Sequence, residues 1–175
     1  MRIITRIKSA IGLEERSVLG VNGWPVPLSA SAVTPATAQG VSAVYACVQA
    51  IAETTASLPL ILFKRNGDDR ERASDHPLYR VLHDQANPEQ TALEAREYMQ
   101  ACVLLRGNAF ARIVRGWDGQ VRELWPLNPD NVTVQRTASG LVYDYTKDGD
   151  LTRLLSHEVL HLRHRLADDG VMGVS

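Results

Sequence analysis

Hydrophobic positions recur with a helical period in the first half of the chain and with a period of two in the second half. The first clear pattern lies between Val41 and Thr55, where Thr34 and Pro35 form an N-cap and first helical position and Pro59 ends the run. We expect this helix to be mostly buried, against its own domain or a neighbour. Its apolar positions are Val41, Val44, Tyr45, Val48, Ile51, Ala52 and Thr55, with a second, small flank of Ala43, Ala46 and Ala50.

Two further helices are predicted after a short strand. The segment LPLILFKRN (58–66) is typical of a strand, followed by Asn66-Gly67 and a charged loop, DDRERAS (68–74). Asp75 is the predicted cap of a short helix at 76–84. Thr91 and Glu94 form a capping box that begins the next helix, which ends at Gly107 in a left-handed conformation. The predicted inner face of that helix consists of Ala95, Tyr98, Met99, Cys102 and Leu105.

From residue 109 onward the pattern predicts consecutive antiparallel strands. AFARIVR (109–115) and QVRELW (120–125) flank a turn at Asp118-Gly119, and VTVQR (132–136) and LVYDYT (141–146) continue the meander. A last strand starts at Val159 and places leucines and basic residues on opposite sides. Helices followed by an antiparallel meander indicate an α+β fold with the N-terminal helices packed on the sheet.

Composition and charge limit the number of domains and the classes of function. The chain has 175 residues, of which 45% are hydrophobic and 22% charged, and this composition is ordinary for one globular domain. Its net charge of −1 gives no excess of basic residues that would indicate nucleic-acid binding. We expect an arm or linker at 1–32 and one domain at 33–175. Arg2, Arg6 and Lys8 interrupt the N-terminal isoleucines, so no secretory signal or membrane segment is predicted and we expect a soluble intracellular protein. The two cysteines, Cys47 and Cys102, are expected to be reduced core thiols.

One motif invites a catalytic interpretation. His157-Glu158-Val159-Leu160-His161 (157–161) matches the H-E-x-x-H of zinc hydrolases, in which two histidines one helical turn apart bind zinc and the glutamate activates water. Here the alternating pattern from Val159 favours a strand, which would hold the two imidazoles more than about 12 Å apart. No glutamate follows as a third ligand. A zinc-dependent hydrolase therefore stays an alternative, and we predict no catalytic, cofactor-binding or metal-binding residue.

A small nucleic-acid-binding module is the second alternative. Four aromatic residues lie on or next to predicted strands and could stack on single-stranded bases, but no basic cluster surrounds them, which favours core or interface packing. These residues are Trp117, Trp125, Tyr143 and Tyr145.

The order of motifs resembles the N-terminal part of HK97-type phage portal proteins. The pieces are VTPATA, VSAVYACVQAIAETTASLPLILFKR, HPLYRVLHDQANPEQTALEAREYMQACVLLRGNAFARIVR, GQVRELWPLNPDNVTV, YDYT and EVLHLRH, ending in DGVMGVS, and they span roughly 33–175. The shared features are a small-residue helix ending in S-L-P-L, an H-P-L helix, the pair Asn87-Pro88 before a capped helix, a G-N-A strand start and an L-x-P-L-x-P turn. The resemblance implies the wing-like α+β region of a portal, with stem and clip absent.

The resemblance also implies a function. Such proteins form a dodecameric ring at one capsid vertex through which double-stranded DNA is packaged and ejected, with no catalytic residue and no cofactor. The implied partners are further copies of the chain, terminase, capsid and head-tail connector proteins, and DNA in the channel, with no membrane. The implied locations are the virion and, during assembly, the host cytoplasm. A near-neutral chain suits a channel in which DNA slides, because many basic contacts would hold it tightly.

Overall fold

The computed structural model describes residues 18–19, 25–26, 42–138 and 140–174, in two compact units, 1–38 and 39–175. In the first unit, β1 (Val18–Leu19) pairs antiparallel with β2 (Pro25–Val26). The rest of the predicted arm at 1–32 and the predicted helix start at Thr34 and Pro35 lie outside the described residues.

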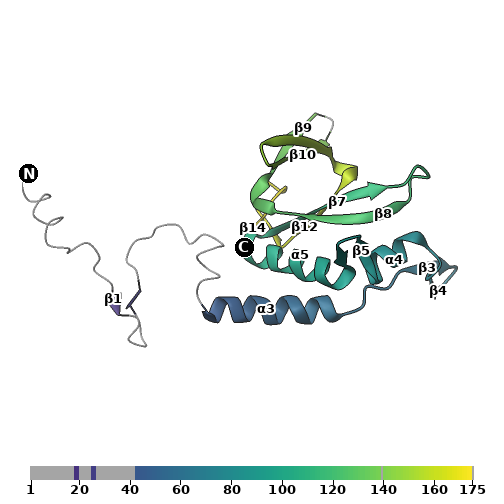
Figure 1. The fold of residues 1–175 in the computed structure, drawn as a ribbon, viewed down its shortest axis with the longest axis horizontal. Helices are drawn as coiled ribbons and strands as arrows, with labels where there is room; N and C mark the ends of the chain where they lie inside the picture. Colours follow the sequence, from purple (N-terminus) through teal and green to yellow (C-terminus); the bar gives the residue numbers. More distant parts are fainter. Residues whose placement is uncertain (1–17, 20–24, 27–41, 139, 175) are drawn as a thin grey trace, which may run out of the picture. The chain divides into compact units, whose positions relative to one another are not determined.

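The second unit combines three helices with two three-stranded antiparallel sheets, which confirms the α+β prediction (Figure 1). The helices are α3 (Ser42–Ser57), α4 (Pro77–His83) and α5 (Ala92–Arg106). The first sheet has the order β12 (Val159–Arg163), β7 (Asn108–Arg115), β8 (Val121–Leu127). The second has the order β11 (Asp150–Leu155), β10 (Gly140–Lys147), β9 (Val132–Thr137).

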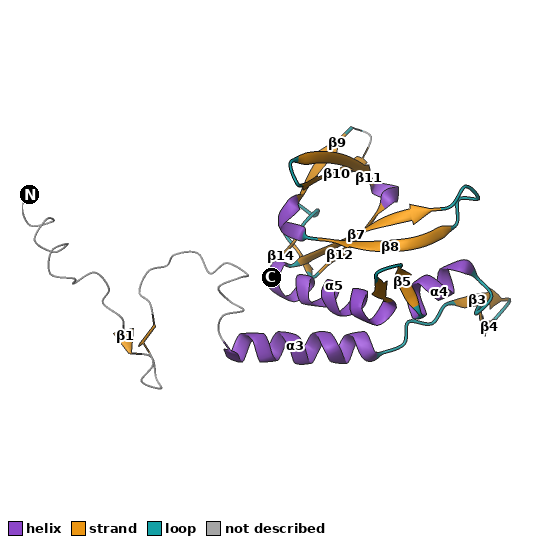
Figure 2. Cartoon of the chain, in the orientation of Figure 1, coloured by secondary structure: helices purple, strands orange, loops and turns teal. Residues whose placement is uncertain are grey.

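Side chains from both sheets form one core, and α5 forms a second core on the opposite face of the first sheet. Alternation along the strands supplies the first core, because inward residues come from every strand. Helices therefore cover one face of β7–β8 while β9–β10 cover the other (Figure 2). The sheet–sheet core holds Phe110, Leu127, Val132, Tyr143, Leu154 and Val159. The helix–sheet core holds Met99, Cys102, Val103, Ala109 and Ala111, with Leu160 packed against it.

The last long strand is thus covered on both faces. Val159 belongs to the sheet–sheet core and Leu160 packs towards α5, as the predicted alternation requires. The strand prediction for this segment is confirmed, and His161 also lies between the sheets, against Phe110 and Tyr143.

Short elements connect these layers. They include two 3-10 turns, η1 (Pro129–Asn131) and η2 (Ser156–Glu158), and the small antiparallel pairs β5 (Gln85–Asn87) with β6 (Gln90–Thr91) and β13 (Arg165–Leu166) with β14 (Gly173–Val174). A third pair, β3 (Phe63–Asn66) with β4 (Asp69–Arg72), corrects the prediction of a charged loop at 68–74. Gly67, with φ of 62°, permits a tight turn here, so the charged residues form the second strand of a hairpin.

Local signals fixed most helix ends. The capping box is present, since Thr91 Oγ1 accepts from the Glu94 amide at 3.2 Å and the Glu94 carboxylate accepts from the Thr91 amide at 2.8 Å. Gly107 ends α5 with φ of 72°, as predicted. The cap of α4 is His76 and not Asp75, because the His76 ring nitrogen Nδ1 accepts from the Leu78 amide at 3.1 Å.

The predicted inner face of α5 holds in part. Ala95, Met99 and Cys102 are buried, but Tyr98 is 39% exposed at the edge of the helix. Burial raises the pKa of the Cys102 thiol, which fits the predicted core thiol. Cys47, in contrast, is exposed, so the prediction of a core position was wrong for this residue.

Helix α3 differs most from expectation. Only Ala52 and Ala56 are buried, where their small side chains face α5, whereas Tyr45 is 52% and Ile51 48% exposed. The prediction of a mostly buried helix is therefore wrong for the single chain. No described helix combines the length and hydropathy required to cross a membrane.

Candidate functional site

The residues of the H-E-x-x-H motif are divided between a 3-10 turn and a strand. His157 and Glu158 belong to η2, while His161 lies in β12. The Glu158 carboxylate accepts from the Leu155 amide at 2.8 Å and so closes the turn. Within the described part of the chain, no three His, Cys, Asp or Glu side chains are grouped in a way that could hold a metal ion. The geometry therefore lacks the single helical turn on which the zinc interpretation rests.

Both ring nitrogens of His161 are engaged by the fold. Nε2 lies 3.0 Å from Asn108 Oδ1, and Nδ1 lies 3.3 Å from the Tyr143 hydroxyl. Because an amide oxygen only accepts, Nε2 carries the proton and Nδ1 accepts from Tyr143. Burial, with a smaller contribution from Arg163, lowers the pKa of His161 to about 4, so the ring is neutral at neutral pH.

Asn108 is the hub of this network. Its Oδ1 also accepts from the Gly173 amide at 2.7 Å, and its Nδ2 donates to the carbonyls of Gly173 at 2.8 Å and Arg106 at 3.0 Å. The buried amide thus ties the end of α5 to β12 and to β14. Sequence reasoning assigned the "GNAF" glycine only a helix stop and gave Asn108 no role; the available signal was a polar residue at an inward position of an alternating strand.

The backbone around Gly107 and Gly173 is packed too closely for side chains. A Cβ on Gly107 would lie 2.6 Å from the Gly173 carbonyl oxygen, and a Cβ on Gly173 would collide with the Gly107 carbonyl. The Gly107 carbonyl also accepts from the His164 amide at 2.9 Å. We call this contact of residues 107–108 with Gly173 the glycine clasp. It holds the chain near its C-terminal end against the junction of α5 and β7.

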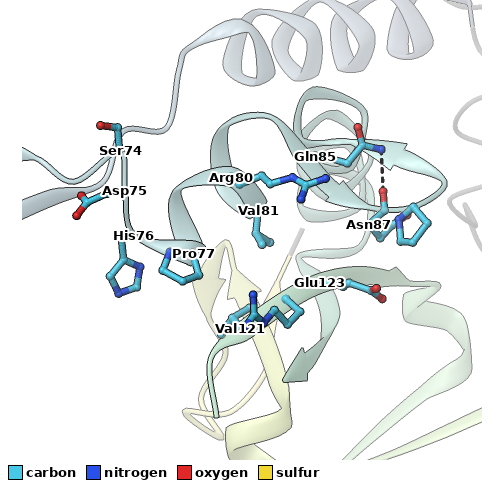
Figure 3. A pocket seen from close by; sticks show the side chains of 12 residues that line it. Ser74, Asp75, His76, Pro77, Arg80, Val81, Gln85, Asn87, Val121 and Glu123 are labelled. Atoms are coloured by element: carbon cyan, nitrogen blue, oxygen red, sulfur yellow. Dashed lines mark hydrogen bonds between the residues drawn. The ribbon is translucent and has the colours of Figure 1, made fainter. Parts of the chain in front are cut away.

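A polar cleft of about 710 Å³ lies between α4 and β8 (Figure 3). At one end the Gln85 amide donates to the Asn87 carbonyl at 2.8 Å, and buried Asn87 donates to the Leu124 carbonyl at 2.9 Å. The Glu123 carboxylate accepts a hydrogen bond from the Trp125 indole at 2.6 Å, so it already has a partner within the fold. The cleft carries charges of both signs, and among its described residues no hydrogen bond joins the Ser74 hydroxyl to the Asp75 carboxylate or the His76 ring, whose Nδ1 accepts from the Leu78 amide. Its geometry therefore lacks the activated nucleophile of covalent catalysis.

The four aromatic residues of the nucleic-acid alternative do not share one exposed face. Trp117 is fully exposed at the tip of the β7–β8 hairpin, whereas Tyr143 is buried between the sheets. Trp125 and Tyr145 line a separate cleft of about 500 Å³. The arrangement therefore provides no continuous stacking platform.

Helix α3 carries an apolar side that the fold leaves open. Val44, Val48, Ile51 and Thr55 are spaced by four, three and four residues, which places them along one side of the helix. Thr55 and, past the helix end, Leu60 line an apolar groove of about 370 Å³. The opposite wall of the groove includes Leu82, Met99, Leu160 and Leu162. We call the four helix residues together with this groove the α3 surface; Glu53 is the only charged residue of the helix.

Comparison with protein families gives a match between residues 42–175 and the family described as phage portal protein. This range covers every helix of the described residues and both three-stranded sheets. The chain belongs to the phage portal protein family. The HK97-type resemblance inferred from the motif order is thereby confirmed, and within the portal family a curated relative is the portal protein of Enterobacteria phage HK97, which is 34% identical over 137 residues.

Solved structures show the portal fold independently of sequence. The chain superposes on a protein in the neck of a native gene transfer agent particle, computed with C12 symmetry, with a TM-score of 0.66 and 24% identity over 99% of this chain. An HK97 family phage portal protein from Corynebacterium diphtheriae gives a TM-score of 0.53 and 17% identity over 74% of this chain. At these identities the likeness concerns the fold.

The chain spans only part of the length of each of these proteins. The matches cover 32% of the HK97 portal protein, 44% of the gene transfer agent protein and 40% of the Corynebacterium protein. The motifs that carried the resemblance correspond to defined elements: SAVYACVQ lies in α3, Asn87-Pro88 stands at the end of β5, and G-N-A joins α5 to β7.

Proposed function

We propose that this chain is part of a portal subunit, a structural component that assembles with further copies into a ring at the capsid vertex through which DNA is packaged and ejected. Membership of the portal family supports this proposal, and so does the symmetric neck particle that contains a protein of the same fold. We further propose that 33–175 corresponds to the wing-like region, that 1–32 acts as an arm, and that the subunit performs no catalysis.

The observation that carries the proposal is the α3 surface. A helix of sixteen residues with one charge and with Ile51 and Tyr45 about half exposed is typical of a subunit interface, whose centre is poor in charge. A ring requires each subunit to bury a surface against its neighbours. We therefore assign a second copy of the chain as the occupant of the α3 surface. The location that follows is the virion, with assembly in the host cytoplasm, and terminase, capsid and head-tail connector proteins are the further partners we propose.

Self-association of the 175-residue chain tests this assignment. We expect the average molecular mass measured by light scattering to rise as the protein concentration rises from about 10 to 500 μM. Ile51→Glu should abolish this rise, because a carboxylate buried without a partner in the interface opposes association. Leu151→Glu is the matched control, since Leu151 is 64% exposed on β11, away from the α3 surface. A chain that stays monomeric at every concentration, or equal loss in both variants, contradicts the assignment.

A further inference from the structure

The β3–β4 hairpin is a separate, fully exposed element. It pairs with no other strand of the described residues, and all eight of its strand residues are exposed. Its ladder is extended by one bond, from the Ala73 amide to the Leu62 carbonyl at 2.9 Å. A two-stranded hairpin without a buried face is marginally stable, so its side chains are free to serve contacts outside the domain.

The register of the hairpin separates its charges. Phe63 is paired with Arg72 and Arg65 with Arg70, so these four side chains share one face. The intervening pairs, Lys64 with Glu71 and Asn66 with Asp69, point to the other face. Both carboxylates of the strands therefore lie opposite the three arginines. We call Arg65, Arg70 and Arg72 the arginine face.

No carboxylate of the described residues forms an ion pair with the arginine face. Among the described residues, the ion pairs involve other arginines and a histidine, and none reaches these three side chains. Arg65 Nε donates to the Gly67 carbonyl at 3.1 Å, which leaves its charge unbalanced. Like charges directly across an antiparallel pair are destabilising, and Arg65 and Arg70 are such a pair. An anion held between them would remove this repulsion.

We propose that the arginine face binds the phosphate backbone of double-stranded DNA. Guanidinium groups match phosphate oxygens with two parallel hydrogen bonds, and duplex DNA carries one negative charge per about 1.7 Å of its axis, far denser than the mixed charges of a protein surface. That DNA is near this domain rests on the proposed portal function; the site itself rests on the hairpin. The net charge of −1 does not oppose it, because exposed charges beyond about 10 Å are screened.

Contacts of this kind fit a surface past which DNA moves. Three phosphate contacts give binding without base recognition, and each contributes about −0.9 to the slope of log affinity against log salt. The arginine face therefore predicts a slope of about −2.7, with dissociation constants in the range of about 10⁻⁴ to 10⁻⁶ M that is typical of non-specific binding. Such binding weakens steeply with salt and does not fix the position of the DNA.

The test is fluorescence anisotropy of the full chain with a labelled 25-base-pair duplex, from 20 to 200 mM NaCl. We expect Arg65→Gln/Arg70→Gln to weaken binding at least about tenfold at 20 mM NaCl and to reduce the slope by about 2. Lys64→Gln removes a charge from the same hairpin but from the other face, and we expect at most about a twofold change. Far-UV circular dichroism checks that the variants fold.

Three outcomes overturn the proposal. The first is no DNA binding at 20 mM NaCl, and the second is an equal loss of DNA affinity in the double variant and in Lys64→Gln. The third is tighter binding of polyglutamate than of DNA at equal charge, which would assign the arginine face to an acidic protein. Light scattering of the same variants distinguishes failure of the DNA site from failure of ring assembly. If the portal function holds, Arg65→Gln/Arg70→Gln leaves self-association unchanged. Ile51→Glu in turn leaves DNA binding by the monomer unchanged.

Discussion

Asn108 concentrates more hydrogen bonds than any motif residue predicted from the sequence. Replacing it with alanine leaves the buried amide and carbonyl of Gly173 without partners and frees His161 Nε2. Unpaired buried polar groups cost about 1–3 kcal/mol, so we expect Asn108→Ala to lower the free energy of unfolding by at least that amount. Urea denaturation measures it, with Asn131→Ala as the exposed control. Equal stabilities for the two variants would remove Asn108 from its role as hub.

His161 predicts a pH dependence of stability. Its pKa is about 4 in the folded chain and near 6.5 when unfolded. Between these values the unfolded chain binds a proton that the folded chain does not, so this group lowers stability as the pH falls from 6.5 to 4 and has no effect above 6.5. We expect NMR titration of the His161 ring to show a midpoint near 4.

Substitution separates His161 from the other titrating groups. His161→Gln should flatten the stability profile between pH 4 and 6.5, because it removes the proton that only the unfolded chain binds. His157→Gln, at an exposed position of η2, is the matched control for replacing a histidine with glutamine near this strand. A His161 midpoint above pH 6 would contradict the buried, neutral ring.

At the scale of elements, the glycine clasp joins α5 and β7 to β14. Gly107 and Gly67 have similar left-handed φ values, 72° and 62°, but only Gly107 is crowded. Alanine at either position pays the left-handed strain of about 1–2 kcal/mol. At Gly107 its Cβ also meets the Gly173 backbone, which adds about 1–3 kcal/mol of overpacking. Urea denaturation should therefore give Gly107→Ala a clearly lower free energy of unfolding than Gly67→Ala. Equal losses of unfolding free energy in the two variants would show that the clasp opens freely.

Elements with a local cause could be predicted from the sequence. Thr91 and Glu94 cap α5 through bonds within one helical turn, and the Asp118-Gly119 turn closes β7–β8 by the same kind of local preference. The strand at Val159 followed from alternation over a few residues, and this alone argued against an H-E-x-x-H helix. Such signals need no knowledge of distant contacts.

Features that depend on distant residues could not be predicted. The exposure of α3 depends on which elements pack against it, and in the single chain only Ala52 and Ala56 of its described side chains are buried. The hydrogen bonds from Asn108 to Gly173 join residues 65 positions apart, beyond any periodic pattern. The second strand of the hairpin, Asp69–Arg72, was missed because its residues alternate in charge and not in hydrophobicity, so the pattern was typical of a loop.

At the scale of the whole molecule, the two cores and α3 differ in how firmly they are held. Strands β7 and β10 are central in their sheets and contribute to the buried core, whereas α3 is attached by two alanines and by Arg96. The Arg96 guanidinium donates to the Ala56 carbonyl at 2.9 and 3.2 Å and to the Leu82 carbonyl at 2.6 Å. One side chain thus links the C-terminal end of α3 to α4 and α5. This arrangement suits a helix whose main partner lies outside the chain.

Hydrogen exchange can test this order of stability. Arg96→Met keeps the apolar stem but removes the bonds to Ala56 and Leu82, so we expect faster amide exchange in residues 50–57. Exchange in β7 and β10 should stay unchanged, because local opening of α3 leaves the sheets paired. Arg80→Met, on the exposed side of α4, is the control and should alter neither region. If α3 and β7 accelerate together, the domain opens as one unit, and α3 cannot rearrange onto a neighbouring subunit without unfolding the sheets.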